Sequence, residues 1–285
     1  MQRIRLLCQG GAFAIALLLQ SYGIAQANET AAQDFSPIPE ITDQFRFSVT
    51  LSAWAPANQT TSYVGGTSLG TLIDSVSDNI QSSNGSAMGG LEVHYDRFGL
   101  LGDFAYWDNN NGKVNHAFVV SRRSTIYASA HSDTRQAIFT GAATYTLLSN
   151  TDWYIDSLLG ARYINTDTSV NLDGKYPVTI VKQFTAGLTQ SGLATNITNA
   201  TIPVIGFKGR ARIANSEWFV PFYGDIGTAG TSFSNTWQAQ AGIARSFDWC
   251  EINLSYRALY FELSGDTLRT KNTFYGPSLG ITFNF

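Results

Sequence analysis

Three histidines are the side chains of this 285-residue chain that could act as a general base near neutral pH. A nucleophile must lie within hydrogen-bond reach of such a base. The run His131-Ser132-Asp133 has suitable residue types, but adjacent residues rarely converge on one reacting atom. His94 and His116 lie far from any second His or Cys, and no glycine-rich phosphate loop is present. The sequence therefore predicts no catalytic residue, no metal and no cofactor.

Charged side chains recur at matched positions on one face of several segments. They are Asp103, Asp156, Arg162, Lys208, Arg210, Arg212, Asp225, Glu251 and Arg257. Charges that face a protein interior must pair with one another or meet water. One interpretation is a salt-bridged plug that stiffens the protein. The other is a narrow constriction that weakly favours anions because Arg and Lys line it.

The segments that carry these charges alternate apolar and polar residues with a period of two, which is typical of β-strands. In 205–213, for example, Ile205 and Phe207 alternate with Lys208 and Arg210. Ten such segments can be recognised, at 45–52, 91–96, 100–107, 139–145, 153–163, 205–213, 218–226, 237–243, 251–261 and 275–285. The charges share the polar face, so that face is expected to point inward.

The connections between these segments alternate strictly between short and long. The short ones lie at 96–98, 148–152, 214–217 and 246–249, and the long ones at 58–84, 110–134, 167–199, 228–232 and 264–271. Outer-membrane barrels have short periplasmic turns, longer external loops and an even strand count. The sequence therefore predicts an all-β fold, a transmembrane antiparallel up-and-down β-barrel of ten strands over residues 44–285, with both termini in the periplasm.

Two of the long connections leave the strand count open. Residues 110–134 contain short apolar runs that could extend two strands above the membrane or form an extra hairpin. Residues 72–80 have apolar positions spaced for a short helix or an inner plug. Twelve strands is therefore the alternative count.

The N-terminal region resembles a secretory signal. Arg3 and Arg5 precede a short apolar run, and Ala25-Gln26-Ala27 follows it, so residues 1–27 are predicted to be a signal peptide. Residues 28–43 are predicted to be a flexible periplasmic leader. No later stretch offers eighteen consecutive apolar residues, so a membrane-spanning chain would have to form a closed barrel.

Bulk composition excludes further classes. The net charge is −3 with no basic stripe, so nucleic acid is not an expected partner. Cys250 is the only cysteine after the signal segment, which excludes an intrachain disulfide.

The six tryptophans lie near predicted strand ends, which suggests aromatic girdles at the two membrane interfaces. They are Trp54, Trp107, Trp153, Trp218, Trp237 and Trp249.

Several segments resemble an uncharacterised family of proteobacterial outer-membrane β-barrel proteins, within the small-barrel superfamily. The matching pieces are M-G-G-L-E-V-H-Y-D-R-F-G-L-L-G-D-F-A-Y-W-D (88–108), L-L-G-A-R-Y (158–163), F-Y-G-D-I-G (222–227), W-Q-A-Q-A-G-I-A (237–244), L-S-Y-R-A-L-Y-F (254–261) and G-P-S-L-G-I-T-F-N-F (276–285). The resemblance implies a location in the outer membrane, contact with its lipid and lipopolysaccharide, and recognition of the last strand, which ends at Phe285, by the barrel-assembly machinery.

The expected function is a structural barrel or a narrow, porin-like passage for small solutes, without catalysis. Two alternatives stay open. One is an outer-membrane barrel enzyme that hydrolyses lipid or peptide. The other is a surface adhesion or interaction protein that acts through its external loops, at 58–84, 110–134 and 167–199.

Overall fold

The computed structural model describes residues 36–64, 67–121, 124–172, 193–230, 234–264 and 268–285. The predicted signal peptide and residues 28–35 lie outside this range. The strands are β1 (Phe45–Trp54), β2 (Ala57–Val64), β3 (Thr67–Asp74), β4 (Ser83–Tyr95), β5 (Phe98–Ser121), β6 (Ser124–Ser149), β7 (Trp153–Leu172), β8 (Leu193–Arg212), β9 (Trp218–Thr228), β10 (Asn235–Ser246), β11 (Glu251–Ser264) and β12 (Leu268–Asn284). One short helix, α2 (Val76–Ser82), joins β3 to β4.

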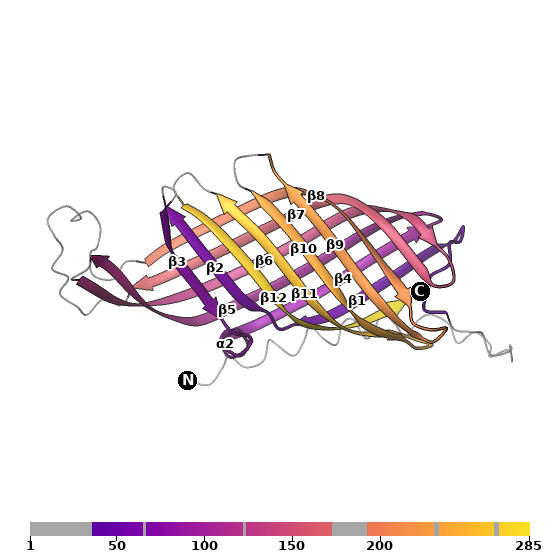
Figure 1. Ribbon diagram of the computed structural model, residues 1–285, viewed down its shortest axis with the longest axis horizontal. Helices are drawn as coiled ribbons and strands as arrows, with labels where there is room; N and C mark the ends of the chain where they lie inside the picture. Colours follow the sequence, from indigo (N-terminus) through magenta and orange to yellow (C-terminus); the bar gives the residue numbers. More distant parts are fainter. Residues whose placement is uncertain (1–35, 65–66, 122–123, 173–192, 231–233, 265–267) are drawn as a thin grey trace, which may run out of the picture. The chain divides into compact units, whose positions relative to one another are not determined.

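Ten of these strands form a closed antiparallel ring (Figure 1). Neighbours in the ring follow chain order from β4 to β12, and β1 pairs with both β4 and β12. The closing seam runs from Ser48 opposite Asn284 to Trp54 opposite Ser278. The ten-strand prediction is confirmed for this ring, because β2 and β3 lie outside it.

The first strand of the ring breaks where proline interrupts it. β1 pairs with the second half of β12. β2 pairs with the first half of β12, from Tyr275 opposite Ala57 to Leu268 opposite Val64. Ala55-Pro56 separates the two strands, and proline has no backbone N–H to donate to the ladder. β2 and β3 therefore extend the wall beyond the ring at the long-loop end.

Helix α2 begins at a side-chain cap. The Ser75 hydroxyl accepts the Asp78 N–H at 3.3 Å, and the Asp78 carboxylate accepts the Ser75 N–H at 3.2 Å, a reciprocal arrangement typical of a helix start. A short helix was one of two predictions for 72–80. The other, an inner plug, is wrong, because Ile73 and Ile80 are exposed.

Strand extension also accounts for residues 110–134. β5 and β6 stay paired as far as Ser121 opposite Ser124, so this connection is a long hairpin of two ring strands. The turns at the opposite end are short, as predicted. Asp96, Ala214 and Asn215 adopt positive φ there, and the Asn150 side chain accepts the N–H groups of Asp152 and Trp153.

The outer face of the ring is apolar. Large side chains such as Leu91, Leu159 and Ile226 are more than 60 % exposed although they lie within strands of the ring. Such a band suits lipid contact, since an up-and-down barrel in a membrane faces lipid outside. No helix in the described ranges is long and apolar enough to cross a membrane.

The tryptophans divide into two groups. Trp153, Trp218, Trp237 and Trp249 are exposed near strand ends, in keeping with the girdle prediction. For the other two the prediction is wrong, because Trp54 and Trp107 are buried inside the ring. Their rings pack edge to face, in a T-shaped arrangement, at a centroid distance of 6.0 Å. Residue 54 shares its face with Ser48 and Thr50, so its inward direction follows from the strand period.

Candidate functional site in the barrel interior

The interior of the ring is layered along the strands. We call the cluster nearest the long loops the apolar layer. It contains Trp54, Met88, Ala105, Trp107, Ile138, Ile164, Ile202, Leu259, Phe261, Leu263 and Phe274, contributed by eight ring strands. Ile138, Ile164, Ile202, Leu259 and Phe261 have no exposed surface at all. The sequence predicted that the polar face of each strand points inward, but this layer is as apolar as the core of a soluble domain.

A charged layer lies next to it, built around Arg162. Its guanidinium forms a two-pronged ion pair with Asp225, and both side chains are fully buried. The remaining donors reach Thr140, Thr236 and Gln238 at 3.1, 2.8 and 3.2 Å. A buried ion pair is tolerated only when such additional hydrogen bonds satisfy both partners.

A second pair joins this layer through a shared glutamine. Arg257 Nη2 donates to Asp103 Oδ1 at 2.7 Å and to Gln238 Oε1 at 3.1 Å. The same Gln238 oxygen accepts from Arg162, so one amide connects the two ion pairs. The Arg257 guanidinium also lies 5.2 Å from the centre of a Trp54 ring, which couples the charged layer to the apolar one.

A glycine makes room for the buried aspartate. A Cβ atom at Gly206 would lie 2.1 Å from the carbonyl oxygen of Gly224 and 2.8 Å from Cβ of Asp225. Because Gly206 and Asp225 are register partners on β8 and β9, the close approach is a property of this strand pair. The glycine therefore permits the backbone contact that holds Asp225 in place.

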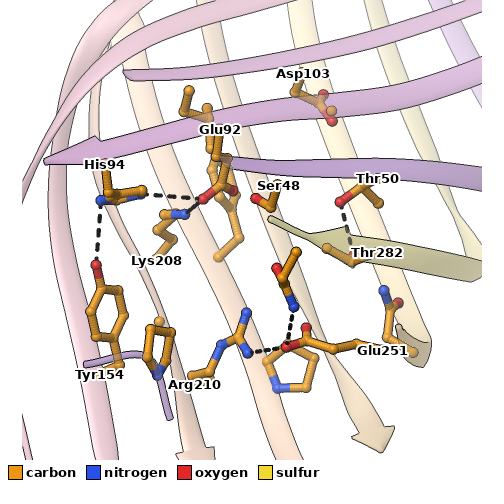
Figure 2. A pocket seen from close by; sticks show the side chains of 18 of the residues that line it. Ser48, Thr50, Glu92, His94, Asp103, Tyr154, Lys208, Arg210, Glu251 and Thr282 are labelled. Carbon is orange, nitrogen blue, oxygen red and sulfur yellow. Dashed lines mark hydrogen bonds and ion pairs between the residues drawn. The ribbon is translucent and has the colours of Figure 1, made fainter. Parts of the chain in front are cut away.

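The remaining predicted charges lie nearer the short turns, at the corresponding ends of β7, β8 and β11. Figure 2 shows Lys208, Arg210 and Glu251 among the side chains that line one pocket there. Lys208 forms an ion pair with Glu92, and its Nζ lies 3.9 Å from Asp156 Oδ2. Arg210 Nη1 donates to Glu251 Oε1 at 2.7 Å. Arg212 does not join them, because its Nε donates to the Ser216 carbonyl in the turn after β8.

Two members of this group were not among the predicted site residues. Glu92 lies 3.5 Å from Nε2 of His94, and the Tyr154 hydroxyl lies 3.4 Å from Nδ1 of the same ring. Both Glu92 and His94 fall on the polar face of the 91–96 alternation, so the signal was available in the sequence. Asp156 is fully buried, and neither of its carboxylate oxygens has a hydrogen-bond partner among the described residues.

A cavity of about 550 Å³ occupies the interior at the short-turn end. Four cations line it, namely Arg46, Lys208, Arg210 and Arg257, and four carboxylates, Glu40, Glu92, Asp103 and Glu251. Thr50 and Thr282 also line it and bond across the closing seam at 2.9 Å. No group of three or more His, Cys, Asp or Glu side chains in the described ranges is placed to hold a metal ion.

The segment before β1 forms part of the cavity wall. The carbonyl of Pro37 accepts from Arg210 at 3.0 Å, that of Pro39 from Ser149 at 3.3 Å, and that of Thr42 from the Asp96 amide at 2.9 Å. Ile38 is 5 % exposed. Three carbonyl groups spread over six residues thus hold the described part of the leader against the barrel.

A known protein of solved structure shares the fold but not the sequence. The outer membrane protease OmpT from Escherichia coli is similar over 87 % of this chain and 99 % of its own, with a TM-score of 0.57 and 8 % identity. The translocator domain of the autotransporter NalP from Neisseria meningitidis follows at a TM-score of 0.37 and 11 % identity, covering 85 % of this chain and 88 % of its own. No family model matches the sequence, and no curated protein does.

An identity of 8 % supports a conclusion about the fold alone. OmpT is a protease, so the fold accommodates catalysis without requiring it. The closed ten-stranded ring, the apolar outer face and the likeness to OmpT agree with one another. The chain has the fold of the outer-membrane β-barrel proteins of Gram-negative bacteria.

Proposed function

We propose that this protein is a structural outer-membrane barrel with a sealed lumen, and that it neither conducts solutes nor catalyses a reaction. The apolar layer is the observation that carries the proposal. Its side chains come from eight of the ten ring strands, and six of them, Ala105 included, are wholly inaccessible to water. Since hydrophobic constrictions block ions by excluding water, a filled one leaves no aqueous path.

The charged layer supports the same conclusion. Arg162 and Arg257 are each paired with a carboxylate and also donate to Gln238. A passage that favours anions needs cations that remain available to the moving ion. Paired charges inside a narrow barrel instead link strands that are not neighbours, as Arg162 of β7 does with Asp225 of β9 and Arg257 of β11 with Asp103 of β5. Bracing the barrel from within is the role we assign to the predicted charge cluster.

Catalysis finds no support in the described interior. The Nδ1 atom of His94 lies beside the hydroxyl of Tyr154, which also bonds to Thr146 at 3.0 Å, and its Nε2 atom faces Glu92. A nucleophilic mechanism needs a Ser, Thr, Cys or comparable group activated by such a base. We therefore propose a non-enzymatic barrel, with membrane lipid and lipopolysaccharide against its outer face and the assembly machinery acting on the strand that ends at Phe285.

Planar-bilayer recording of the refolded protein tests the proposal. The wild-type barrel is expected to insert without discrete conductance steps. A triple variant, Trp54→Ala with Phe261→Ala and Phe274→Ala, empties much of the apolar layer and should conduct, which shows that a silent membrane does contain protein. Triple substitution of the lipid-facing Leu91, Leu159 and Ile226 by Ala is the matched control and should stay silent. Conductance steps from the wild-type protein would overturn the proposal.

A further inference from the structure

The outer face of the barrel carries a group of charged and aromatic side chains at the long-loop end of β11, β12 and β2, which are neighbours in the wall (Figure 1). We call this group the basic patch; its members are Tyr63, Tyr260, Glu262, Arg269 and Lys271. Tyr260 and Glu262 continue the outward row of the exposed Tyr256. Register places Lys271 opposite Glu262 and Arg269 opposite Tyr63, so all five side chains belong to the outer face.

Cations outnumber carboxylates in the basic patch. Glu262 is buried, and both of its oxygens are engaged, one by Arg269 Nε and the other by the Tyr260 hydroxyl at 2.9 Å. Lys271 is only partly buried, and among the residues that the structure describes it forms no ion pair and no hydrogen bond. The Arg269 side chain is 31 % exposed. The patch therefore presents one positive charge in excess to whatever surrounds the barrel.

Tyr63 holds the two cations at one place. Its ring centre lies 5.6 Å from Arg269 Cζ and 5.3 Å from Lys271 Nζ. The two cations are two positions apart on the outward face of β12, roughly 7 Å along the strand. Phosphate oxygens accept charge-assisted hydrogen bonds from both kinds of side chain, so two fixed cations at this spacing suit a phosphorylated headgroup.

The basic patch lies just beyond the lipid-facing band. Toward the short turns the same outward rows are apolar, and Leu254, Tyr256 and Leu279 are more than half exposed there. At the boundary Trp237 stacks on Tyr260 at a centroid distance of 6.2 Å, which is typical of an interfacial aromatic girdle. The long loops of outer-membrane barrels face the cell exterior, so the patch lies at the headgroups of the outer leaflet.

We propose that the basic patch binds a phosphate of the lipid A part of lipopolysaccharide. Basic side chains at a membrane surface attract anionic headgroups, and Lys271 supplies the charge in excess. The wall of β5 to β7 differs at the same end, because Arg135 pairs with Asp108 and lies opposite Asp167 in register. Carboxylates outnumber cations there, so the site is confined to one side of the barrel. The inference rests on the lipopolysaccharide contact proposed above, and not on the sealed lumen.

Native mass spectrometry of the refolded barrel in neutral detergent, titrated with diphosphoryl lipid A, tests the proposal. Lipid A stripped of its phosphates should bind at least about tenfold more weakly. Lys271→Gln should weaken binding of diphosphoryl lipid A about fivefold, the effect of one basic side chain at an anionic membrane surface, whereas Lys271→Arg should retain it. Arg135→Gln is the matched control, since it removes a cation that is 61 % exposed at the same end, and should leave the affinity unchanged.

Phosphatidylglycerol distinguishes the two lipid sources of a phosphate. It carries one phosphate where lipid A carries two, and should bind at least about tenfold more weakly. Each variant is checked for heat-modifiable migration on a gel, so that affinities are read only from folded barrels. Equal binding of the two forms of lipid A, equal binding of phosphatidylglycerol, wild-type affinity in Lys271→Gln, or an equal loss in Lys271→Arg or Arg135→Gln would each overturn the proposal. Conductance steps in a planar bilayer would overturn the sealed lumen alone.

Discussion

At the scale of single residues, the interior charges differ in how completely hydrogen bonds and ion pairs satisfy them. Arg162 makes five contacts through its guanidinium with Asp225 and three neutral side chains. Arg46, on the same inward face, makes none that the described ranges record. The first pattern is typical of a structural ion pair.

Removing one member of the buried ion pair should lower the stability of the fold far more than breaking an exposed ion pair. Arg162→Ala leaves Asp225 charged and buried, and we expect it to lower the free energy of unfolding by about 3–5 kcal/mol. Arg245→Ala breaks a pair whose side chains are 42 % and 47 % exposed, and should change it by about 0–1 kcal/mol. Urea titration in detergent, followed by tryptophan fluorescence, measures both.

A compensating double variant separates charge from packing. Arg162→Met with Asp225→Leu removes both charges and keeps most of the volume, so a large part of the lost stability should return. If the double variant were as unstable as Arg162→Ala, the pair would act through its shape and its neutral hydrogen bonds.

At the scale of elements, proline and glycine decide where the ladder breaks and where strands approach closely. Pro56 ends β1, after which β2 and β3 continue the wall outside the ring. Helix α2 returns the chain to β4 and is tied to this break, because the Asn79 side chain donates to the Pro56 carbonyl at 2.9 Å. The cap and this hydrogen bond to the wall both hold the helix in place.

The cap of α2 should respond to pH. Hydrogen bonds from the Ser75 side chain and backbone lower the pKa of Asp78 from its ordinary value of 3.8. A lowered pKa in the folded state means that the stabilisation is present above 3.8 and is lost as the pH falls through the lowered value. Amide hydrogen exchange of residues 76–82 should accelerate, relative to neighbouring strands, between about pH 5 and pH 2.

Two variants identify the group responsible. Asp78→Asn should abolish the pH-dependent step, because the amide cannot titrate, whereas Asp74→Asn should retain it. A step that survived Asp78→Asn would assign the pH dependence to another carboxylate near the helix.

At the scale of the whole molecule, one seam turns a sheet into a barrel. β1 meets β12 with Thr50 opposite Thr282, and their hydroxyl oxygens lie 2.9 Å apart on the inner face. Closure removes the unpaired edges that lipid cannot satisfy. Every other pairing in the ring joins strands that are consecutive in the chain or separated only by β2 and β3, so this seam alone brings the two ends of the barrel together.

Cross-linking tests closure and register together. In a Cys250→Ser background, Thr50→Cys with Thr282→Cys should form a disulfide on oxidation of the folded barrel, because register partners lie within bonding range. Thr50→Cys with Ser278→Cys also points inward, but the two sites are four residues out of register, about 13 Å along the strand. That control should not cross-link. Equal cross-linking in both variants would contradict the register.

The sequence accounts for most of the architecture. The ring is predicted by the ten segments of alternating polarity and by the alternation of short and long connections. A barrel with lipid outside and polar groups inside gives every strand of its wall a period of two. The same period places Glu92 and His94 inside, although the predicted site omitted them. Arg212 was included on period alone, but its strand ends at a turn, where the Ser216 carbonyl accepts its Nε.

The sequence by itself determined which face of each strand points inward, since that depends only on local alternation between apolar and polar residues. Only the tertiary structure decided what the inward face contains at each depth. Pairing in register sets the height of every side chain, and this brings apolar residues of eight strands into one dry layer, joins Arg162 to Asp225, and leaves Arg46 without an acceptor. Those contacts join residues far apart in the chain, so no local pattern encodes them.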